Sequence, residues 1–239
     1  MSSSDASTWQ IPHETYTPEA WAREDKYQCS FLVPKDDALD FAVQNSTEKG
    51  LPAISVSPAQ GKFMYLISKS INAKRILEIG TLGGHSALWL ARSLPADGEL
   101  ITLELKEKHA QVARENFDNA GKDVSGRIKI IVGSASESLA QLKPDPQPFD
   151  LVFIDADTAN LPTYYKEAKR LVRSGGVILI DNMIGAWNGF PSDPANNDSE
   201  TQKIREVLQL LKDDTEAEAT TIPYADRRGY DGFTYIVRK

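Results

Sequence analysis

The sequence predicts an α/β fold in which a mostly parallel sheet carries helices on both faces. Three observations support this prediction. Five short apolar segments between residues 75 and 180 alternate with connections long enough to contain helices. Glycine or acidic residues follow several of these segments, at the sheet edge where ligands bind in open α/β folds. Two β-rich segments near the C-terminus can add an antiparallel hairpin, which gives seven strands in all.

The first 50 residues are predicted to form a polar tail and a helical extension. Residues 14–50 are rich in polar side chains, and the run Pro34-Lys35-Asp36-Asp37 is typical of a helix start. Residues 38–44 have helical apolar spacing, and Gly50 is expected to end this helix. A further helix is expected from about Ser57.

Strands and helices alternate from residue 75 onward. We predict strands over residues 75–79, 100–105, 128–132, 149–154 and 177–180. The intervening helices are expected over residues 86–94, 107–120 and 136–142, and in a segment that ends near Arg173. Gly175 and Gly176 are expected to turn the chain into the fifth strand.

The C-terminal part departs from this alternation. Residues 201–211 have the pattern of a helix, and residues 219–222 and 233–237 read as the two strands of a hairpin. No internal repeat or low-complexity segment is visible. We therefore expect residues 1–50 to form the tail and extension, and residues 51–239 to form one main domain.

Composition and charge narrow the possible functions. The 239-residue chain has a net charge of -7, which argues against a nucleic-acid backbone as the main ligand. No apolar run approaches the roughly 18 residues that a membrane-spanning helix needs. Residues 1–8 resemble neither a secretory signal nor a transit peptide. The single cysteine, Cys29, cannot form an internal disulfide, so we expect a reducing compartment, the cytoplasm by default, and interpret Cys29 as structural rather than nucleophilic.

A glycine-rich turn follows the first predicted strand. The sequence there reads Glu78-Ile79-Gly80-Thr81-Leu82-Gly83-Gly84-His85-Ser86. Glycines allow the backbone to approach a ligand closely and to turn into a helix. The spacing is not G-x-G-x-x-G, and an acid at the strand end would repel a pyrophosphate, so the dinucleotide fingerprint of a dehydrogenase is not met. Glu78 suits a cationic cofactor instead.

The second strand carries a matching acid. Glu104 is placed to accept hydrogen bonds from both hydroxyls of an adenosine ribose. The alternative is that Gly80, Gly83 and Gly84 only form a turn and that Glu104 is a solvated strand end. The combination of acids and glycines at two strand ends favours a cofactor site.

Short oxygen-bearing side chains follow the fourth and fifth strands. Asp155-Ala156-Asp157 ends one strand and Asp181-Asn182 ends the next, so both groups reach the same sheet edge. Asp155, Asp181 and Asn182 together suit a hard cation such as Mg²⁺, Mn²⁺ or Ca²⁺ rather than zinc. Asp and Asn are also common in turns and helix caps, and for Asp157 alone we prefer that interpretation.

The remaining candidates are less specific. His85 either lines a cofactor pocket or packs in the turn, whereas His13 and His109 are expected at the surface. Trp187 and Asn188, just after the proposed cation site, could form a wall for a planar substrate, or Trp187 could simply be buried in a long loop.

These motifs together resemble the cation-dependent O-methyltransferases of the caffeoyl-CoA and catechol type, and most closely their small bacterial and fungal branch. The resemblance runs from about Asp36 to the C-terminus. It rests on residues 77–86, 149–157 and 180–182, with support from residues 54–61 and 229–233.

The resemblance implies a Rossmann-like class I methyltransferase fold that binds S-adenosylmethionine (SAM) and a divalent cation, and that methylates a vicinal dihydroxy (catechol-type) small molecule. It implies a homodimer whose N-terminal helices help cover the substrate. The implied cation ligands, through which catalysis would act, are Asp155, Asp181 and Asn182. The implied cofactor residues are Val56, Glu78, Gly80, Thr81, Ser86, Glu104, Ala135, Asp155 and Asp157.

Two departures from the family pattern bear on catalysis and on acceptor specificity. Many relatives carry a lysine directly after Asp-Ala-Asp, but this chain has Thr158, which cannot act as a base. The stretch after Asn182 is also longer than the plant pattern. Whether Lys166 or water accepts the proton is left open. The alternative functions are a non-catalytic cofactor-binding relative, for which Thr158 would mark lost chemistry, and an NAD-dependent dehydrogenase.

Overall fold

The computed structural model describes residues 17–184, 189–226 and 229–239. Its strands are β1 (Arg75–Ile79), β2 (Glu99–Glu104), β3 (Ile128–Val132), β4 (Phe149–Ile154), β5 (Val172–Ile180), β6 (Ala217–Asp226) and β7 (Gly229–Arg238). Its helices are α1 (Pro18–Leu32), α2 (Asp37–Glu48), α3 (Pro58–Ser70), α4 (His85–Ser93), α5 (Glu107–Asn119), α6 (Lys122–Ser125), α7 (Ala135–Gln141), α8 (Leu161–Leu171) and α9 (Ser199–Asp213), with a 3₁₀ turn, η2 (Thr158–Asn160).

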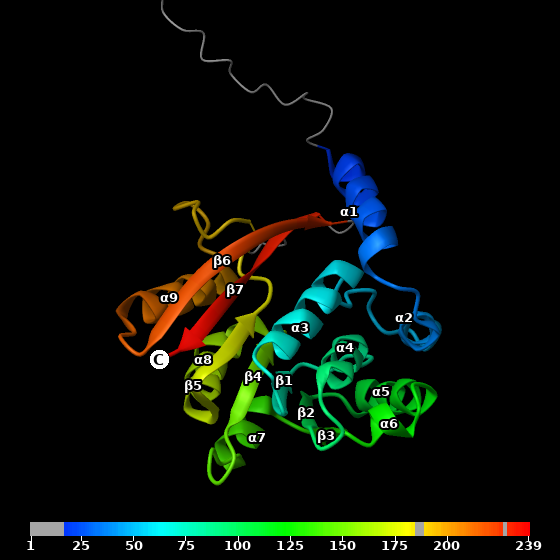
Figure 1. Cartoon of the computed structure of the whole chain (residues 1–239). Coiled ribbons are helices and arrows are strands. Elements are labelled where there is room, and N and C mark those ends of the chain that lie inside the picture. The colour runs from blue at the N-terminus through cyan, green and yellow to red at the C-terminus, as the bar shows by residue number, and fades with distance from the viewer. Residues whose placement is uncertain (1–16, 185–188, 227–228) are drawn as a thin grey trace, which may run out of the picture.

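The strands form a seven-stranded sheet in the order β3-β2-β1-β4-β5-β7-β6 (Figure 1). Strands β1 to β5 pair in parallel, and β7 is antiparallel to both of its neighbours, β5 and β6. The predicted fold, a mostly parallel sheet completed by an antiparallel hairpin, is confirmed. The strand order reverses between β1 and β4, which is where ligands bind in open α/β sheets.

Helices cover both faces of the sheet because side chains along each central strand alternate between two cores. Leu77, Val152 and Ile178 point into a core shared with α7, α8 and α9. Ile76 and Leu151 point into a second core shared with α2, α3, α4, α5 and α6. The central strands are therefore buried on both faces, as their continuous apolar sequences predict.

Several boundaries differ from the predicted ones. Strand β5 begins at Val172 rather than at residue 177, because its first residue pairs with Phe149 before a register shift in the β4–β5 ladder. Gly175 and Gly176 therefore lie inside a strand, not before it. Both hairpin strands extend well beyond residues 219–222 and 233–237, since their ladder runs from the Ala217–Arg238 pair to the Asp226–Gly229 pair.

The N-terminal extension is helical, as predicted. The Asp36 side chain caps α2 by accepting the N–H groups of Ala38 and Leu39, each at 3.1 Å. Gly50, with a φ of 72°, follows the end of this helix. Helix α1 contacts α3 and β6 and lies at the rim of the molecule (Figure 1).

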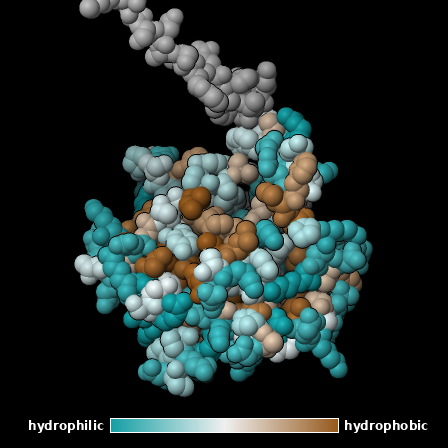
Figure 2. All heavy atoms as spheres, viewed as in Figure 1, coloured by the Kyte–Doolittle hydropathy of each residue, from teal (hydrophilic) through white to brown (hydrophobic). Residues whose placement is uncertain are grey.

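Figure 2 shows apolar side chains gathered in the middle of the face seen in Figure 1, with polar residues around them. No helix in the described ranges combines the length and apolarity that crossing a membrane requires.

Candidate functional site

A cavity of about 730 Å³ opens where β1, β2, β4 and β5 end. The segments that follow these strands contribute much of its lining, and β6, β7 and α9 supply further residues. The predicted site residues that line it are Val56, Gly80, Thr81, Ser86, Glu104, Ala135, Asp155, Asp157, Asp181 and Asn182. Glu78 lies fully buried beneath this surface. Trp187 and Asn188 lie outside the described residues.

The glycine turn is shaped by contact between neighbouring strand ends. Gly80 has a φ of 101°, and a Cβ there would overlap the carbonyl oxygen of Asp155. The Asp155 N–H in turn donates to the carbonyl of Ile79 at 2.9 Å. Only glycine can hold this conformation at so short an approach. Leu82, with a φ of 50°, adds a left-handed residue that has a side chain.

Glu104 ties this turn to the end of β2. Its Oε2 accepts the backbone N–H groups of Thr81 at 3.2 Å and Leu82 at 2.8 Å. Its Oε1 accepts the N–H of Lys106 at 2.9 Å and lies 3.3 Å from His109 Nδ1. Glu104 is only 7% exposed, and backbone donors on two sides fix the direction of its carboxylate at the cavity wall.

Glu78 is a buried acid close to the cavity. Burial raises the pKa of its carboxyl from 4.5 to about 8, although hydrogen bonds from the Ser86 and Thr102 hydroxyls lower it. The negative charges of Asp155 and Glu104 raise it further. Its Oε2 accepts from Thr102 at 2.6 Å, whereas Oε1 has no hydrogen-bond partner among the described residues. A nearby cationic group would favour the ionised carboxylate.

Asp155, Asp181 and Asn182 come together where β4 and β5 end. Asn182 Nδ2 donates to Asp155 Oδ1 at 2.9 Å, and Asn182 itself has a φ of 60°. Asp181 is 6% exposed and accepts from Gln60 Nε2 at 3.2 and 3.3 Å and from the Tyr224 hydroxyl at 3.1 Å. The sheet register thus brings the two predicted acid clusters to one place.

This cluster offers a cation two carboxylate groups and one side-chain amide as ligands. Within the described ranges, no three His, Cys, Asp or Glu side chains form a group able to hold a metal ion. The cluster has oxygen ligands only, which fits a hard cation rather than zinc. Mg²⁺ commonly uses one or two carboxylates and keeps other positions for water or substrate oxygens, so this set meets its minimum requirement.

Asp157 lies on the cavity wall and caps the next turn. Its Oδ2 accepts from Asn160 N at 3.1 Å and its Oδ1 from the Tyr164 hydroxyl at 2.5 Å. Burial, followed by this hydrogen bond and the charge of Asp157, raises the pKa of Tyr164. Thr158 also lines the cavity, whereas Lys166 is exposed and does not.

The structure corrects one sequence interpretation and adds two residues. His109, expected at the surface, is half-buried against Glu104 and lines the cavity. Helix α5 places it there, one turn after β2. Gln60 and Tyr224 were not predicted, although Gln60 completes a capping box with Ser57 that the S-x-x-Q spacing could have indicated.

The sequence analysis also singled out His85 and Cys29, and the structure places only His85 at the cavity. His85 is buried and lines the cavity. Cys29 lies on α1, partly buried, with its thiol 3.8 Å from Asp25 Oδ1. Burial and the Asp25 charge raise the pKa of this thiol, which makes it a poorer nucleophile.

Comparison with known proteins shows the family to which the chain is similar. The model of the O-methyltransferase family matches residues 33–238. A catechol O-methyltransferase from Mycobacterium tuberculosis is 43% identical over 209 residues, which cover 87% of this chain and 92% of that protein.

Two solved structures are also similar. An O-methyltransferase from Bacillus cereus in complex with SAH superposes with a TM-score of 0.88 at 40% identity, covering 93% of this chain and 100% of the other. One from Streptomyces achromogenes, involved in tomaymycin synthesis and in complex with SAM, gives 0.87 at 38% identity, covering 93% and 98%. On the family match and these identities, the chain belongs to the O-methyltransferase family.

Proposed function

We propose that this protein transfers a methyl group from SAM to one hydroxyl of a vicinal dihydroxy aromatic compound, with a divalent cation bound between enzyme and acceptor. One observation carries the proposal. The Asp155–Asn182 pair and Asp181 lie in the same cavity as the glycine turn and Glu104. A donor site and an acceptor site are thus expected on neighbouring strand ends of one sheet.

The cofactor assignment is supported by the buried acids and the shape of the turn. Glu104, held by backbone donors, is expected to accept the ribose hydroxyls, and Glu78 is expected to stabilise the positively charged methionine end. The full proposed set is Val56, Glu78, Gly80, Thr81, Ser86, Glu104, Ala135, Asp155 and Asp157. Relatives solved with SAM and with SAH share the fold at 38% and 40% identity, which supports SAM as the methyl donor.

The cation assignment is supported by the chemistry of the ligands. We propose Asp155, Asp181 and Asn182 as the protein ligands, which act in catalysis through the cation. When bound, a divalent cation would lower the pKa of an acceptor hydroxyl and hold its oxygen in place. Gln60 and Tyr224 donate to Asp181 and so restrict its orientation, as partners of metal ligands commonly do.

The acceptor class is proposed from geometry and from similarity. Only two adjacent hydroxyls can occupy two positions of one ion while one oxygen faces the methyl donor. The similar protein from Mycobacterium tuberculosis is named a catechol O-methyltransferase. The chain's own contribution to the reaction is to align the two substrates and exclude water, because the sulfonium methyl is already activated.

The decisive experiment is a methyl-transfer assay with SAM and a simple catechol, combined with titration calorimetry against SAM and NAD. Turnover together with SAM binding supports the proposal. SAM binding without turnover of any vicinal diol would indicate the non-catalytic alternative. Binding of NAD in place of SAM would indicate a dehydrogenase.

A further inference from the structure

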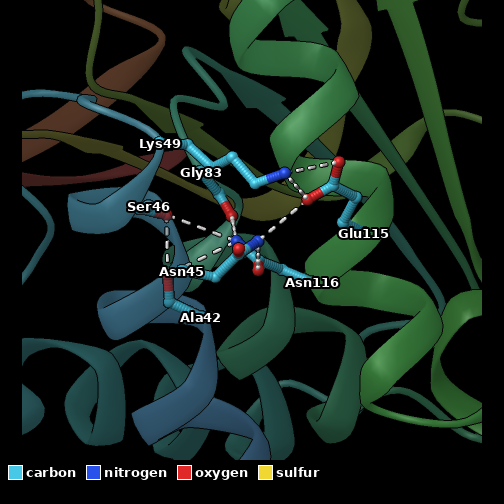
Figure 3. Close-up of polar contacts among 7 residues, drawn as sticks. All are labelled: Ala42, Asn45, Ser46, Lys49, Gly83, Glu115 and Asn116. Carbon is cyan, nitrogen blue, oxygen red and sulfur yellow. Dashed lines mark hydrogen bonds and ion pairs between the residues drawn. The ribbon is translucent and has the colours of Figure 1, made fainter.

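We propose that Asn116 is a positioning residue for the cofactor turn and that it makes helix α2 a structural part of the cofactor site. This inference rests on the proposed function. Asn116 lies on α5, and its side chain is fully buried where α2, α5 and the turn after β1 meet (Figure 3). None of its polar contacts reaches the cavity directly.

The hydrogen bonds of Asn116 join all three segments. Its Nδ2 donates to the carbonyl of Gly83 at 2.8 Å, and longer contacts reach Ser46 Oγ at 3.3 Å and the Ala42 carbonyl at 3.4 Å. Its Oδ1 accepts from Asn45 Nδ2 at 2.9 Å. Asn45 also donates to Glu115, which pairs with Lys49 (Figure 3).

The bond to Gly83 acts on the part of the turn that faces the cofactor. Gly83 directly follows Thr81 and Leu82, which line the cavity and whose N–H groups bind Glu104. The turn is therefore held from two sides. The Glu104 carboxylate accepts its backbone N–H groups, and the Asn116 side chain donates to the carbonyl of Gly83. Because Leu82 has a left-handed φ, this conformation needs outside support.

Helix α2 fits against the same glycine. A Cβ on Gly83 would overlap the hydroxyl of Ser46, and one on Gly84 would overlap the ring of Phe117 on α5. Both helices thus touch the turn backbone itself. A shift of α2 would therefore move the turn, although α2 contributes no residue to the described lining of the cavity.

The test compares Asn116→Asp with Tyr165→Phe as a control. The aspartate keeps an oxygen for Asn45 but places its second oxygen against the Gly83 carbonyl, so the turn must move. Tyr165 is also buried, and its hydroxyl joins α8 to Asp214 away from the cavity. We expect Asn116→Asp to raise the SAM Kd about tenfold or more, whereas the acceptor KM at saturating SAM stays within about twofold of wild type. Tyr165→Phe should leave both constants unchanged.

A second readout is independent of turnover. Hydrogen exchange at the Thr81 and Leu82 amides should accelerate in Asn116→Asp and not in Tyr165→Phe. If Asn116→Asp does not fold, Asn45→Ala removes the donor to Asn116 and should raise the SAM Kd by about two- to fivefold.

Wild-type affinity for SAM in the folded variants, or an equal loss in Tyr165→Phe, would overturn the inference alone. Failure of the wild-type protein to bind SAM would overturn the proposed function and this inference with it.

Discussion

The side-chain amide of Asn182 donates a 2.9 Å hydrogen bond to Asp155, although 27 residues separate them in the chain. The parallel pairing of β4 with β5 brings them together. Ile154 lies opposite Ile180, Asp155 directly follows Ile154, and Asn182 comes two residues after Ile180. The backbone register therefore places the proposed cation ligands close together.

Removal of divalent cations is expected to abolish methyl transfer, and added Mg²⁺ or Mn²⁺ should restore it. Asp181→Asn should have the same effect at ordinary cation concentrations, because it removes one of two ligand charges. Asp214→Asn is the matched control, since Asp214 is a largely buried aspartate that pairs with Lys169 outside the cavity. Full activity in a preparation verified as metal-free would refute the cation proposal.

Glu104→Ala should weaken SAM binding by about 1–3 kcal/mol, because charge-assisted hydrogen bonds to the ribose and the brace on the turn are both lost. Cation affinity should hardly change. Glu99→Ala, at the opposite end of β2 and paired with Arg75, should leave SAM affinity at the wild-type value. Titration calorimetry measures the SAM and cation affinities of Glu104→Ala and the SAM affinity of Glu99→Ala. Unchanged SAM affinity in Glu104→Ala would exclude the ribose role.

Glu78 is expected to make the ligand-free protein less stable as the pH rises. Its pKa is raised in the folded state from 4.5 to about 8, so the folded protein holds a proton that the unfolded chain releases. The stabilising contribution is complete below about pH 4.5 and is lost as the pH rises through 8. When thermal unfolding is measured from pH 5 to pH 9, the Tm of Glu78→Gln should fall less than the Tm of the wild-type protein. Glu137 is exposed, and the Tm of the control variant Glu137→Gln should fall as that of the wild-type protein does. If the Tm of Glu78→Gln also fell in parallel with the wild type, this assignment would be contradicted.

Vicinal diols should react, whereas monophenols and compounds with separated hydroxyls should not. Thr158 adds an expectation about pH, because no lysine amine is supplied at that position and deprotonation should depend on the cation and on bulk base. The rate is therefore expected to climb into the alkaline range. Rapid turnover of a simple monophenol would contradict the chelation model.

Thr158→Lys should raise the rate near neutral pH if the lysine reaches the acceptor oxygen. Thr163→Lys places the same charge on an exposed part of α8 and serves as the control. Initial rates measured across pH 6–10 distinguish the two variants. A flat pH–rate profile in the wild-type protein would contradict the role given to the absent base.

The sheet was predictable because its signals are local. Apolar runs marked the strands, and the residues that followed β1, β2, β4 and β5 marked the sheet edge where the cavity lies. The start of β5 was not predictable, since Gly175 and Gly176 have the local signature of a turn while their neighbours pair with β4. The domain division at residue 50, the homodimer and the cytoplasmic location stay predictions.

The missed contacts of the site have a different cause. Gln60 and Asp181 are 121 residues apart, and their contact depends on where α3 begins relative to β5. His109 was expected at the surface, and only the tertiary structure shows that it lies against Glu104. Side-chain partners that meet through packing of separate elements leave no spacing pattern in one sequence.

The overlap that a side chain on Gly80 would have with Asp155 shows how tightly the ends of β1 and β4 abut. Adjacent strands stand about 4.8 Å apart, a distance maintained by main-chain hydrogen bonds. In the proposed reaction, the spacing of the strands sets the distance between the methyl donor and the cation. The β6–β7 hairpin also lines the cavity, and its Tyr224 holds Asp181, so a redesign for new acceptors should keep Tyr224 and change other lining positions such as Tyr230.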